Sequence, residues 1–124
     1  MTRAYLAFTE KGLALAQKLA SALPGTVARC GHGGPGLADW AAEQFAHGDA
    51  LIFVGAVGIA VRAIAPHCRS KAVDPAVVVL DECGHFAVPI LSGHLGGAND
   101  LARALAAVCG AVPVITTATD ANGV

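Results

Sequence analysis

The sequence predicts an α/β fold built on an open, mainly parallel sheet with helices on both faces. Short apolar runs alternate with segments whose apolar residues recur at helical spacing, and short loops connect them. The run Ala50–Val54 is apolar without interruption, which is typical of a strand covered on both faces. Hydrophobic residues make up 55% of the 124 residues, enough for one core. We therefore expect a single domain over residues 1–124, a three-layer sandwich of the Rossmann or flavodoxin type.

Each element follows from its local pattern. In chain order, apolar runs predict strands over residues 4–8, 27–28, 50–54, 76–80, 86–91 and 112–115. Apolar residues at helical spacing predict helices over residues 10–23, 37–47, 59–64 and 98–108. Thr9 can cap the first helix, Pro24 ends it, and Pro66 ends the third. The run 86–91 can pair with the preceding strand as a hairpin around Gly84, and Pro89 favours an edge position for it.

Composition excludes several classes of protein. The formal net charge is -1 and no long basic run occurs, which disfavours binding to nucleic acid or to a membrane surface. Every apolar run is broken well before the roughly 20 residues that span a bilayer. The four cysteines have no CxxC or zinc-finger spacing, so we expect reduced thiols, no protein metal site and a cytoplasmic location.

Ligands of open parallel sheets bind beyond the carboxyl ends of the strands. Four polar or glycine-rich segments follow predicted strands: residues 9–10, 55–58, 92–99 and 116–120. We expect them to meet at one end of the sheet. The segment 55–58 is GxxG, and the chain contains neither GxGxxG nor GxxxxGK[ST], so the motifs indicate no nucleotide site.

The segment Ser92–Asn99 carries the strongest signal. Glycines before a helix allow close backbone approach to a ligand, and the helix N-terminus favours an anion. The alternative is that these glycines only make a tight turn. His94 lies within this loop and can exchange protons near neutral pH, or it can be a structural histidine bonded to the backbone. We interpret the other histidines, His32, His47, His67 and His85, as surface or loop residues.

Three weaker candidates surround this loop. Arg62 can reach a carboxylate as a forked donor or remain a solvated surface residue. The segment Lys71–Pro75 can face a substrate or make an ordinary Asp-Pro turn. Thr116, Thr117, Thr119 and Asp120 place hydroxyls and a carboxylate beyond the last strand, more polar groups than a simple turn requires.

Five stretches of the chain form a longer combined pattern: Phe8–Gly12, Gly55–Arg62, Lys71–Val77, Leu91–Asn99 and Pro113–Asp120. In this order they resemble the N-terminal part of the CbiG family of cobalamin-biosynthesis proteins. The stretches cover nearly the whole chain, and their combination is specific although each glycine turn alone is not.

The resemblance implies an enzyme, a cobalt-precorrin-5A hydrolase. Such an enzyme opens the δ-lactone of cobalt-precorrin-5A and releases acetaldehyde, giving cobalt-precorrin-5B. The substrate is an acidic tetrapyrrole that carries its own cobalt, so no cofactor is expected. The resemblance also implies that family members usually have a C-terminal domain, which we expect to be absent from this chain. The expected partners are a C-terminal CbiG/CobE-like domain or other cobalamin-pathway enzymes, and self-association into a homo-oligomer stays open.

The resemblance also suggests roles for particular residues. His94, directly or through Thr117, would activate water, and amides near Gly96 and Gly97 would stabilise the oxyanion. The expected substrate-binding residues are Thr9, Glu10, Gly55, Gly58, Arg62, Lys71, Asp74, Ser92, Gly93, Gly96, Gly97, Asn99, Thr116 and Asp120. Two other functions are considered: a non-catalytic corrinoid-binding module that works with a separate domain, and a flavodoxin-like nucleotide binder.

Overall fold

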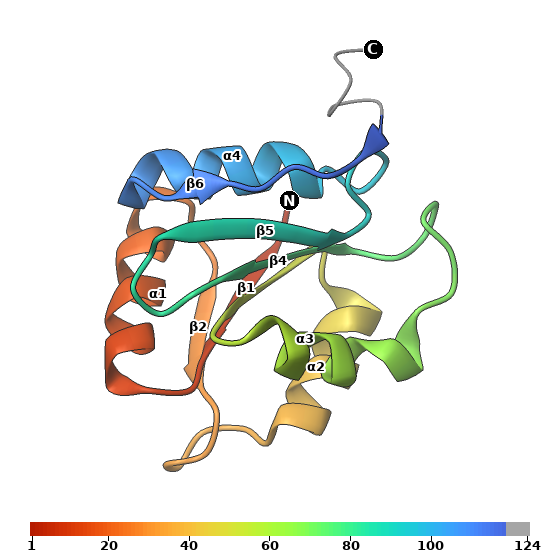
Figure 1. The fold of residues 1–124 in the computed structure, drawn as a ribbon. Coiled ribbons are helices and arrows are strands. Elements are labelled where there is room, and N and C mark those ends of the chain that lie inside the picture. Colours follow the sequence, from red (N-terminus) through yellow and green to blue (C-terminus); the bar gives the residue numbers. More distant parts are fainter. Residues whose placement is uncertain (119–124) are drawn as a thin grey trace.

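A computed structural model describes residues 1–118 and has a six-stranded sheet in the order β2-β1-β3-β4-β5-β6 (Figure 1). The strands are β1 (Arg3–Ala7), β2 (Thr26–Arg29), β3 (Ala50–Val54), β4 (Ala76–Leu80), β5 (Phe86–Leu91) and β6 (Val112–Pro113). The helices are α1 (Glu10–Ala22), α2 (Leu37–His47), α3 (Val57–Ile64) and α4 (Ala98–Cys109), and a 3-10 turn, η1 (Ala65–His67), follows α3. The predicted α/β fold is confirmed, although the last strand is shorter than expected.

Strand direction changes within the sheet. Strands β1 to β4 are mutually parallel, β5 is antiparallel to β4, and β6 is parallel to β5. The predicted hairpin around Gly84 is therefore confirmed. The strand β5 is not the edge of the sheet because β6 pairs with its first two residues, Phe86 and Ala87. Pro89 lies beyond the two residues of β5 that pair with β6. Its missing N–H therefore leaves no hydrogen bond to β6 unmade.

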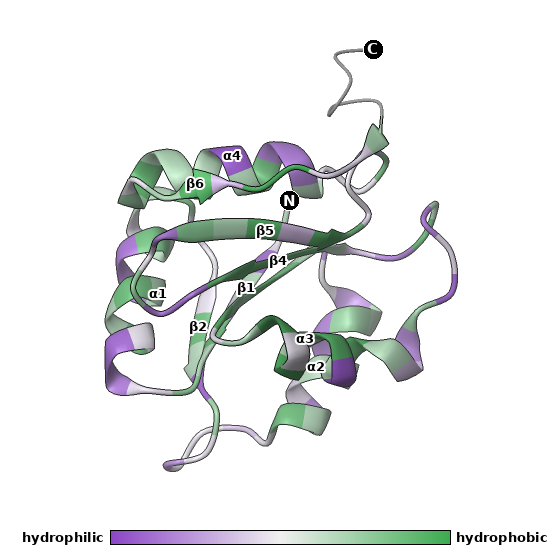
Figure 2. Cartoon of the chain, viewed as in Figure 1, coloured by the Kyte–Doolittle hydropathy of each residue, from purple (hydrophilic) through white to green (hydrophobic). Residues whose placement is uncertain are grey.

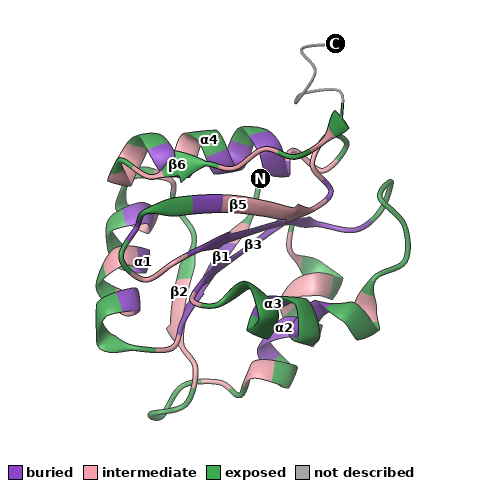
Figure 3. Ribbon diagram, viewed as in Figure 1, coloured by how far each residue is buried: buried purple, intermediate pink, exposed green. Residues whose placement is uncertain are grey.

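Helices cover both faces of the sheet, with α1 and α4 on one face and α2 and α3 on the other (Figure 1). Alternate residues of β1 supply the two cores: Tyr5 and Ala7 pack toward α1 and α4, whereas Ala4 and Leu6 pack toward α2 and α3. The central strands are hydrophobic (Figure 2) and buried (Figure 3). Each fully buried side chain of leucine size contributes about 1.5–3 kcal/mol to stability.

Helix starts follow the expected capping chemistry at α1 but not at α4. Thr9 caps α1, because its Oγ1 accepts a hydrogen bond from the amide of Gly12 at 3.0 Å. The helix α4 begins after Gly97 with no side-chain cap. Within residues 1–118, no helix is long and apolar enough to cross a membrane.

Candidate functional site

The loop after β5 lies at the end of the sheet where β1, β3 and β4 begin. Leu91, the last residue of β5, pairs with Val77 near the start of β4. Ser92 is buried, and its hydroxyl donates to the carbonyl oxygen of Asp74 at 3.0 Å. The loop is thereby attached to the segment that precedes β4. We call this end of the sheet the amino rim; it comprises Thr2, Asp49, Asp74–Pro75, Ser92–Asn99 and Thr116–Thr117.

The loop has a tightly packed shape of its own. Ser92 has a φ of 58° and Gly97 a φ of 81°, both in the left-handed region. A Cβ on Gly96 would lie 2.4 Å from Cβ of Ser92, so only glycine fits there. The amides of Gly97 and Ala98 donate to the carbonyl oxygens of His94 (3.2 Å) and Ser92 (3.1 Å). The Gly97 amide thus donates within the loop, and the oxyanion role expected for amides near Gly96 and Gly97 stays a prediction.

Asn99, in the first turn of α4, joins the loop to the segment after β6. It is 3% exposed, and its Nδ2 donates to Oγ1 of Thr117 at 3.1 Å. A hydroxyl can accept and donate at once, so Thr117 keeps its own proton for another partner. A Cβ on Gly93 would lie 2.9 Å from Oδ1 of Asn99 and 3.0 Å from Cγ2 of Thr117. Gly93 and Asn99 together fix the position of the Thr117 hydroxyl.

His94 lies on the exposed part of the same loop, next to Leu95, which is 68% exposed. Solvent and ligands can therefore reach the imidazole. Thr116 is exposed as well, whereas Asp120 lies outside the described residues. The loop thus presents the His94 side chain to solvent while its backbone amides hold the turn together.

Asp74 has a structural task in this region. The side chain is 7% exposed, and both carboxylate oxygens accept from the amide of Arg69, at 3.1 and 3.0 Å. These bonds close the turn that carries the exposed Lys71. Substrate contacts by Asp74 and Lys71 stay predictions.

The start of the chain lies at the amino rim too. The amide of Thr2 donates to Oδ2 of Asp49 at 2.8 Å, and the Asp49 amide donates to Oγ1 of Thr2 at 3.0 Å. Hydrogen bonds from Thr2 hold the pKa of the Asp49 carboxyl below its ordinary value. The Cε methyl of Met1 is 3.9 Å from a Cβ built on Gly97. The hydrogen bonds between Thr2 and Asp49 thus hold the start of the chain at the amino rim.

The opposite end of the sheet, the carboxyl rim, comprises Phe8–Glu10, Gly55–Gly58 and Asp81–Gly84. The hydroxyl of Thr9 donates to the carboxylate of Glu82 there. The ends of β1 and β3 flank the topological switch point of the sheet, where such folds usually bind ligands. A cavity of about 330 Å³ occupies this position and is lined by Phe8, Thr9, Val54, Gly55, Ala56, Ile59, Asp81 and Glu82.

Charge distinguishes the two rims. At the carboxyl rim Lys11 faces an acidic surrounding that includes Asp81 and Glu82, and its amine donates to Sγ of Cys83 at 3.1 Å. That hydrogen bond, reinforced by the nearby carboxylates, raises the pKa of Lys11 above its ordinary value. The amino rim and the segment before β4 carry the cationic or protonatable side chains His67, Arg69, Lys71 and His94 as well as the carboxylates of Asp49 and Asp74, which accept hydrogen bonds from backbone amides. An acidic ligand is therefore disfavoured less at the amino rim than at the carboxyl rim, and Arg69 and Lys71 are its candidate partners.

The expectation that all four ligand-type segments share one end of the sheet is wrong. Residues 9–10 and 55–58 lie at the carboxyl rim, whereas residues 92–99 and 116–117 lie at the amino rim. The reason is the reversal at β5: because β5 and β6 run opposite to the other strands, their carboxyl ends point the other way. Arg62 is exposed on α3, which covers the face of the sheet opposite to α4.

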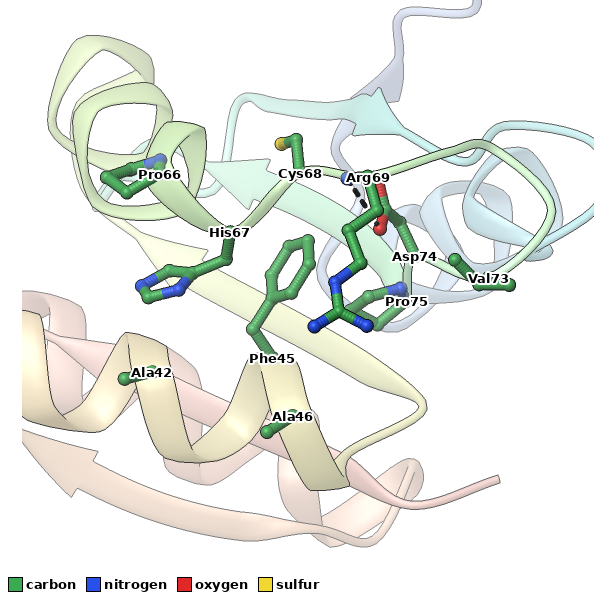
Figure 4. Close-up of a pocket in the computed structure, with 10 residues that line it drawn as sticks. All are labelled: Ala42, Phe45, Ala46, Pro66, His67, Cys68, Arg69, Val73, Asp74 and Pro75. Atoms are coloured by element: carbon green, nitrogen blue, oxygen red, sulfur yellow. Dashed lines mark hydrogen bonds between the residues drawn. The ribbon is translucent and has the colours of Figure 1, made fainter.

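Sequence reasoning missed a larger cavity of about 440 Å³ beside the amino rim (Figure 4). Its lining consists of Ala42, Phe45, Ala46, Pro66, His67, Cys68, Arg69, Val73, Asp74 and Pro75. His67 was expected to be an ordinary surface residue, and Arg69 carried no expectation. The available signal was two basic side chains, two residues apart, in the polar stretch that leads to Asp74–Pro75. Among residues 1–118, no group of three or more His, Cys, Asp or Glu side chains is placed to hold a metal ion.

A mixed sheet with helices on both faces and a hydrogen-bonded glycine loop beside a cavity defines an α/β domain with a candidate small-molecule site. The model of the family described as "Cobalamin synthesis G N-terminal" matches residues 39–120. The chain belongs to this family.

Two relatives of the chain carry the same name, cobalt-precorrin-5A hydrolase, which agrees with this family. The chain is 49% identical over 131 aligned residues to a cobalt-precorrin-5A hydrolase of Salmonella typhimurium, an alignment that covers 96% of the chain and 36% of the relative. It is 53% identical over 70 residues to a protein of the same name from Priestia megaterium, covering 56% of the chain and 19% of the relative. The chain therefore spans about a third or less of the length of these relatives.

A solved structure supports the fold. The crystal structure of a putative cobalamin biosynthesis protein G homolog from Sulfolobus solfataricus superposes with a TM-score of 0.77 and 27% sequence identity. The superposition covers 93% of this chain and 36% of that one. The mixed sheet described above is thus a fold that this relative shares.

Proposed function

We propose that the chain is the N-terminal part of a cobalt-precorrin-5A hydrolase and takes part in cobalamin biosynthesis in the cytoplasm. The observation that carries this proposal is the 49% identity to the Salmonella hydrolase across 96% of the chain. The reaction opens a lactone of an acidic tetrapyrrole and releases acetaldehyde. Cobalt arrives within the substrate, so the protein supplies no metal ligands of its own.

The amino rim is the place where this chemistry fits the chain. Water adds to the lactone carbonyl carbon, the ring C–O bond breaks, and a carboxylate and a hydroxyl group are formed. The C–C bond between the macrocycle and the hydroxyl-bearing carbon then breaks: the hydroxyl loses its proton, the bonding electrons stay with the macrocycle, and the two-carbon unit leaves as acetaldehyde. His94, exposed on the loop, removes the proton from the attacking water, either directly or through the Thr117 hydroxyl that Asn99 positions. Lys71 and the neighbouring basic side chains attract the peripheral carboxylates. Substrate contacts by the carboxyl-rim residues and by Arg62 stay predictions.

Replacing the base tests this assignment. His94→Ala is expected to slow acetaldehyde release by about 10²–10⁴-fold, the usual contribution of a general base. The matched control is His85→Ala, because His85 is an exposed histidine at the other end of the sheet, in the β4–β5 turn. Acetaldehyde is measured by coupling to alcohol dehydrogenase. Equal turnover by His94→Ala and His85→Ala removes His94 from the role of base.

A second function deserves an experiment because the chain spans only 36% of the Salmonella relative. The domain can bind the corrinoid and leave hydrolysis to the remaining part of the longer protein. The chain is incubated with cobalt-precorrin-5A alone, and again with the remaining part of the Salmonella hydrolase. Acetaldehyde from the chain alone supports catalysis by this domain, whereas binding without acetaldehyde until the second part is added supports the binding module.

A further inference from the structure

The cavity beside the amino rim has apolar walls and basic side chains. Phe45 and neighbouring alanines of α2 form one wall, and Val73 and Pro75 belong to the segment that leads into β4. His67 and Arg69 extend from the intervening segment toward α2, on either side of the Phe45 ring (Figure 4). The His67 and Phe45 ring centroids are 5.8 Å apart. Such a cavity suits a ligand arm with an aliphatic stem and an anionic tip.

The guanidinium of Arg69 is available to such a tip. The ion pairs found within residues 1–118 are His47–Glu43, His85–Asp81 and Arg103–Asp100, so Arg69 takes part in none of them. The carboxylate of Asp74 accepts hydrogen bonds from the backbone amide of Arg69. The Asp74 carboxylate thus fixes the backbone from which the Arg69 side chain projects, and a planar guanidinium can bind a carboxylate through two parallel hydrogen bonds.

The cavity shares a wall with the glycine-rich loop. Asp74 lines the cavity, and its carbonyl oxygen accepts the hydrogen bond from the Ser92 hydroxyl at 3.0 Å. A ligand with several arms can therefore engage the loop with one part and the cavity with another.

We propose that this cavity binds a carboxylate side arm of a corrin-type ligand, with Arg69 as the forked partner of the carboxylate and His67 as a second donor. The proposal rests on the proposed function for the identity of the ligand. The aliphatic part of the arm packs on Phe45 and Val73, and the carboxylate lies between the two basic side chains. The macrocycle itself remains outside the cavity, next to the loop that carries His94.

Two ligands and three substitutions test the cavity. The probes are cobyrinic acid, a corrin whose side arms end in carboxyl groups, and its methyl ester, in which those groups are neutral. The 124-residue chain is titrated with each probe, and binding is followed by quenching of the Trp40 fluorescence or by calorimetry. Arg69→Gln is expected to weaken binding of the acid by about 10-fold or more, since hydrogen bonds to charged groups are the strong ones. Binding of the ester should not change.

The variants Arg69→Lys and Lys18→Gln complete the design. Arg69→Lys keeps the charge but loses the fork, so its affinity for the acid should fall between those of the unsubstituted chain and Arg69→Gln. Lys18 is exposed on α1, on the far face of the sheet, and Lys18→Gln removes the same charge without effect on binding. Acid binding that is unaffected by Arg69→Gln overturns the cavity assignment alone. Failure of the unsubstituted chain to bind the acid overturns both this assignment and corrinoid binding by the domain.

Discussion

Gly96 at the amino rim and Gly58 at the carboxyl rim have opposite surroundings. A Cβ on Gly96, at the amino rim, would lie 2.4 Å from Cβ and 2.9 Å from the carbonyl oxygen of Ser92. A Cβ on Gly58, at the carboxyl rim, would meet nothing within 4 Å. Beside Gly58 the apolar side chains Val57 and Ile59 are each 40% exposed, and most of α3 is exposed (Figure 3). The Ser92–Asn99 loop thus has no room for a Cβ at Gly96, whereas the first turn of α3 is open around Gly58.

This difference bears on function because a hydrolytic site needs groups held in fixed positions. Hydrogen bonds from Ser92 and Asn99 attach the amino-rim loop to two other segments of the chain. The carboxyl rim occupies the usual ligand position of a parallel sheet, but its carboxylates disfavour an acidic ligand. The topology of the sheet therefore indicates a ligand site at the carboxyl rim, whereas local packing and charge indicate one at the amino rim.

The largest expected effect is that of Gly96→Ala, which would break the close fit of the amino rim. The added methyl group overlaps Ser92, so the loop must move, and the free energy of unfolding should fall by about 1–3 kcal/mol, as for other overpacked sites. Urea unfolding followed by circular dichroism measures this change. A midpoint equal to that of the unsubstituted chain would show that the loop is loosely held and that the contrast between the rims is false.

Gly58→Ala tests the other side of the comparison. Gly58 is in the first turn of α3 with open space around it, and alanine restricts the unfolded chain more than glycine does. The free energy of unfolding should rise by about 0.4–1 kcal/mol in the same urea experiment. A loss of stability would mean that the carboxyl rim is as crowded as the amino rim.

The smallest effect concerns Cys68, in the cavity beside the amino rim. Burial, and to a lesser degree the carboxylate of Asp74, raise the pKa of the Cys68 thiol above its ordinary value. Because the thiolate is the reactive form, alkylation of Cys68 by iodoacetamide should be slow at neutral pH and accelerate as the pH rises above about 8.5. Asp74→Asn should lower the pKa and modestly speed the reaction.

Mass spectrometry of the peptide that contains Cys68 measures its alkylation rate. Asp39→Asn, on α2 and outside the cavity lining, is the control and should leave the rate unchanged. Equal rates for the two variants would show that the field of the Asp74 carboxylate does not reach the cavity.

Local signals in the sequence predict most of the fold. The capping hydroxyl of Thr9, the uninterrupted strand Ala50–Val54 and the hairpin at Gly84 are all readable from a few neighbouring residues. The placement of the loops is not local. A single antiparallel strand carries Ser92–Asn99 to the other end of the sheet, and no residue within that loop reports the reversal.

The candidate site divides in the same way. The glycine loop with His94 stands out in the sequence because of its composition. The hydrogen bonds that position this loop cannot be read from the sequence. Ser92 and Asp74, like Asn99 and Thr117, are 18 residues apart and meet only in the folded chain. The cavity around Arg69 was missed for the same reason, since α2 supplies one wall and the segment before β4 supplies the other.

The hydrogen bonds between Thr2 and Asp49 have a practical consequence for anyone who handles this protein. They hold the start of the chain at the amino rim, so a peptide fused ahead of Met1 begins at that end of the sheet. A purification tag left at that position would lie at the rim that carries the proposed corrinoid site. Removing the tag before titration separates any obstruction by the tag from a true weakness of the domain.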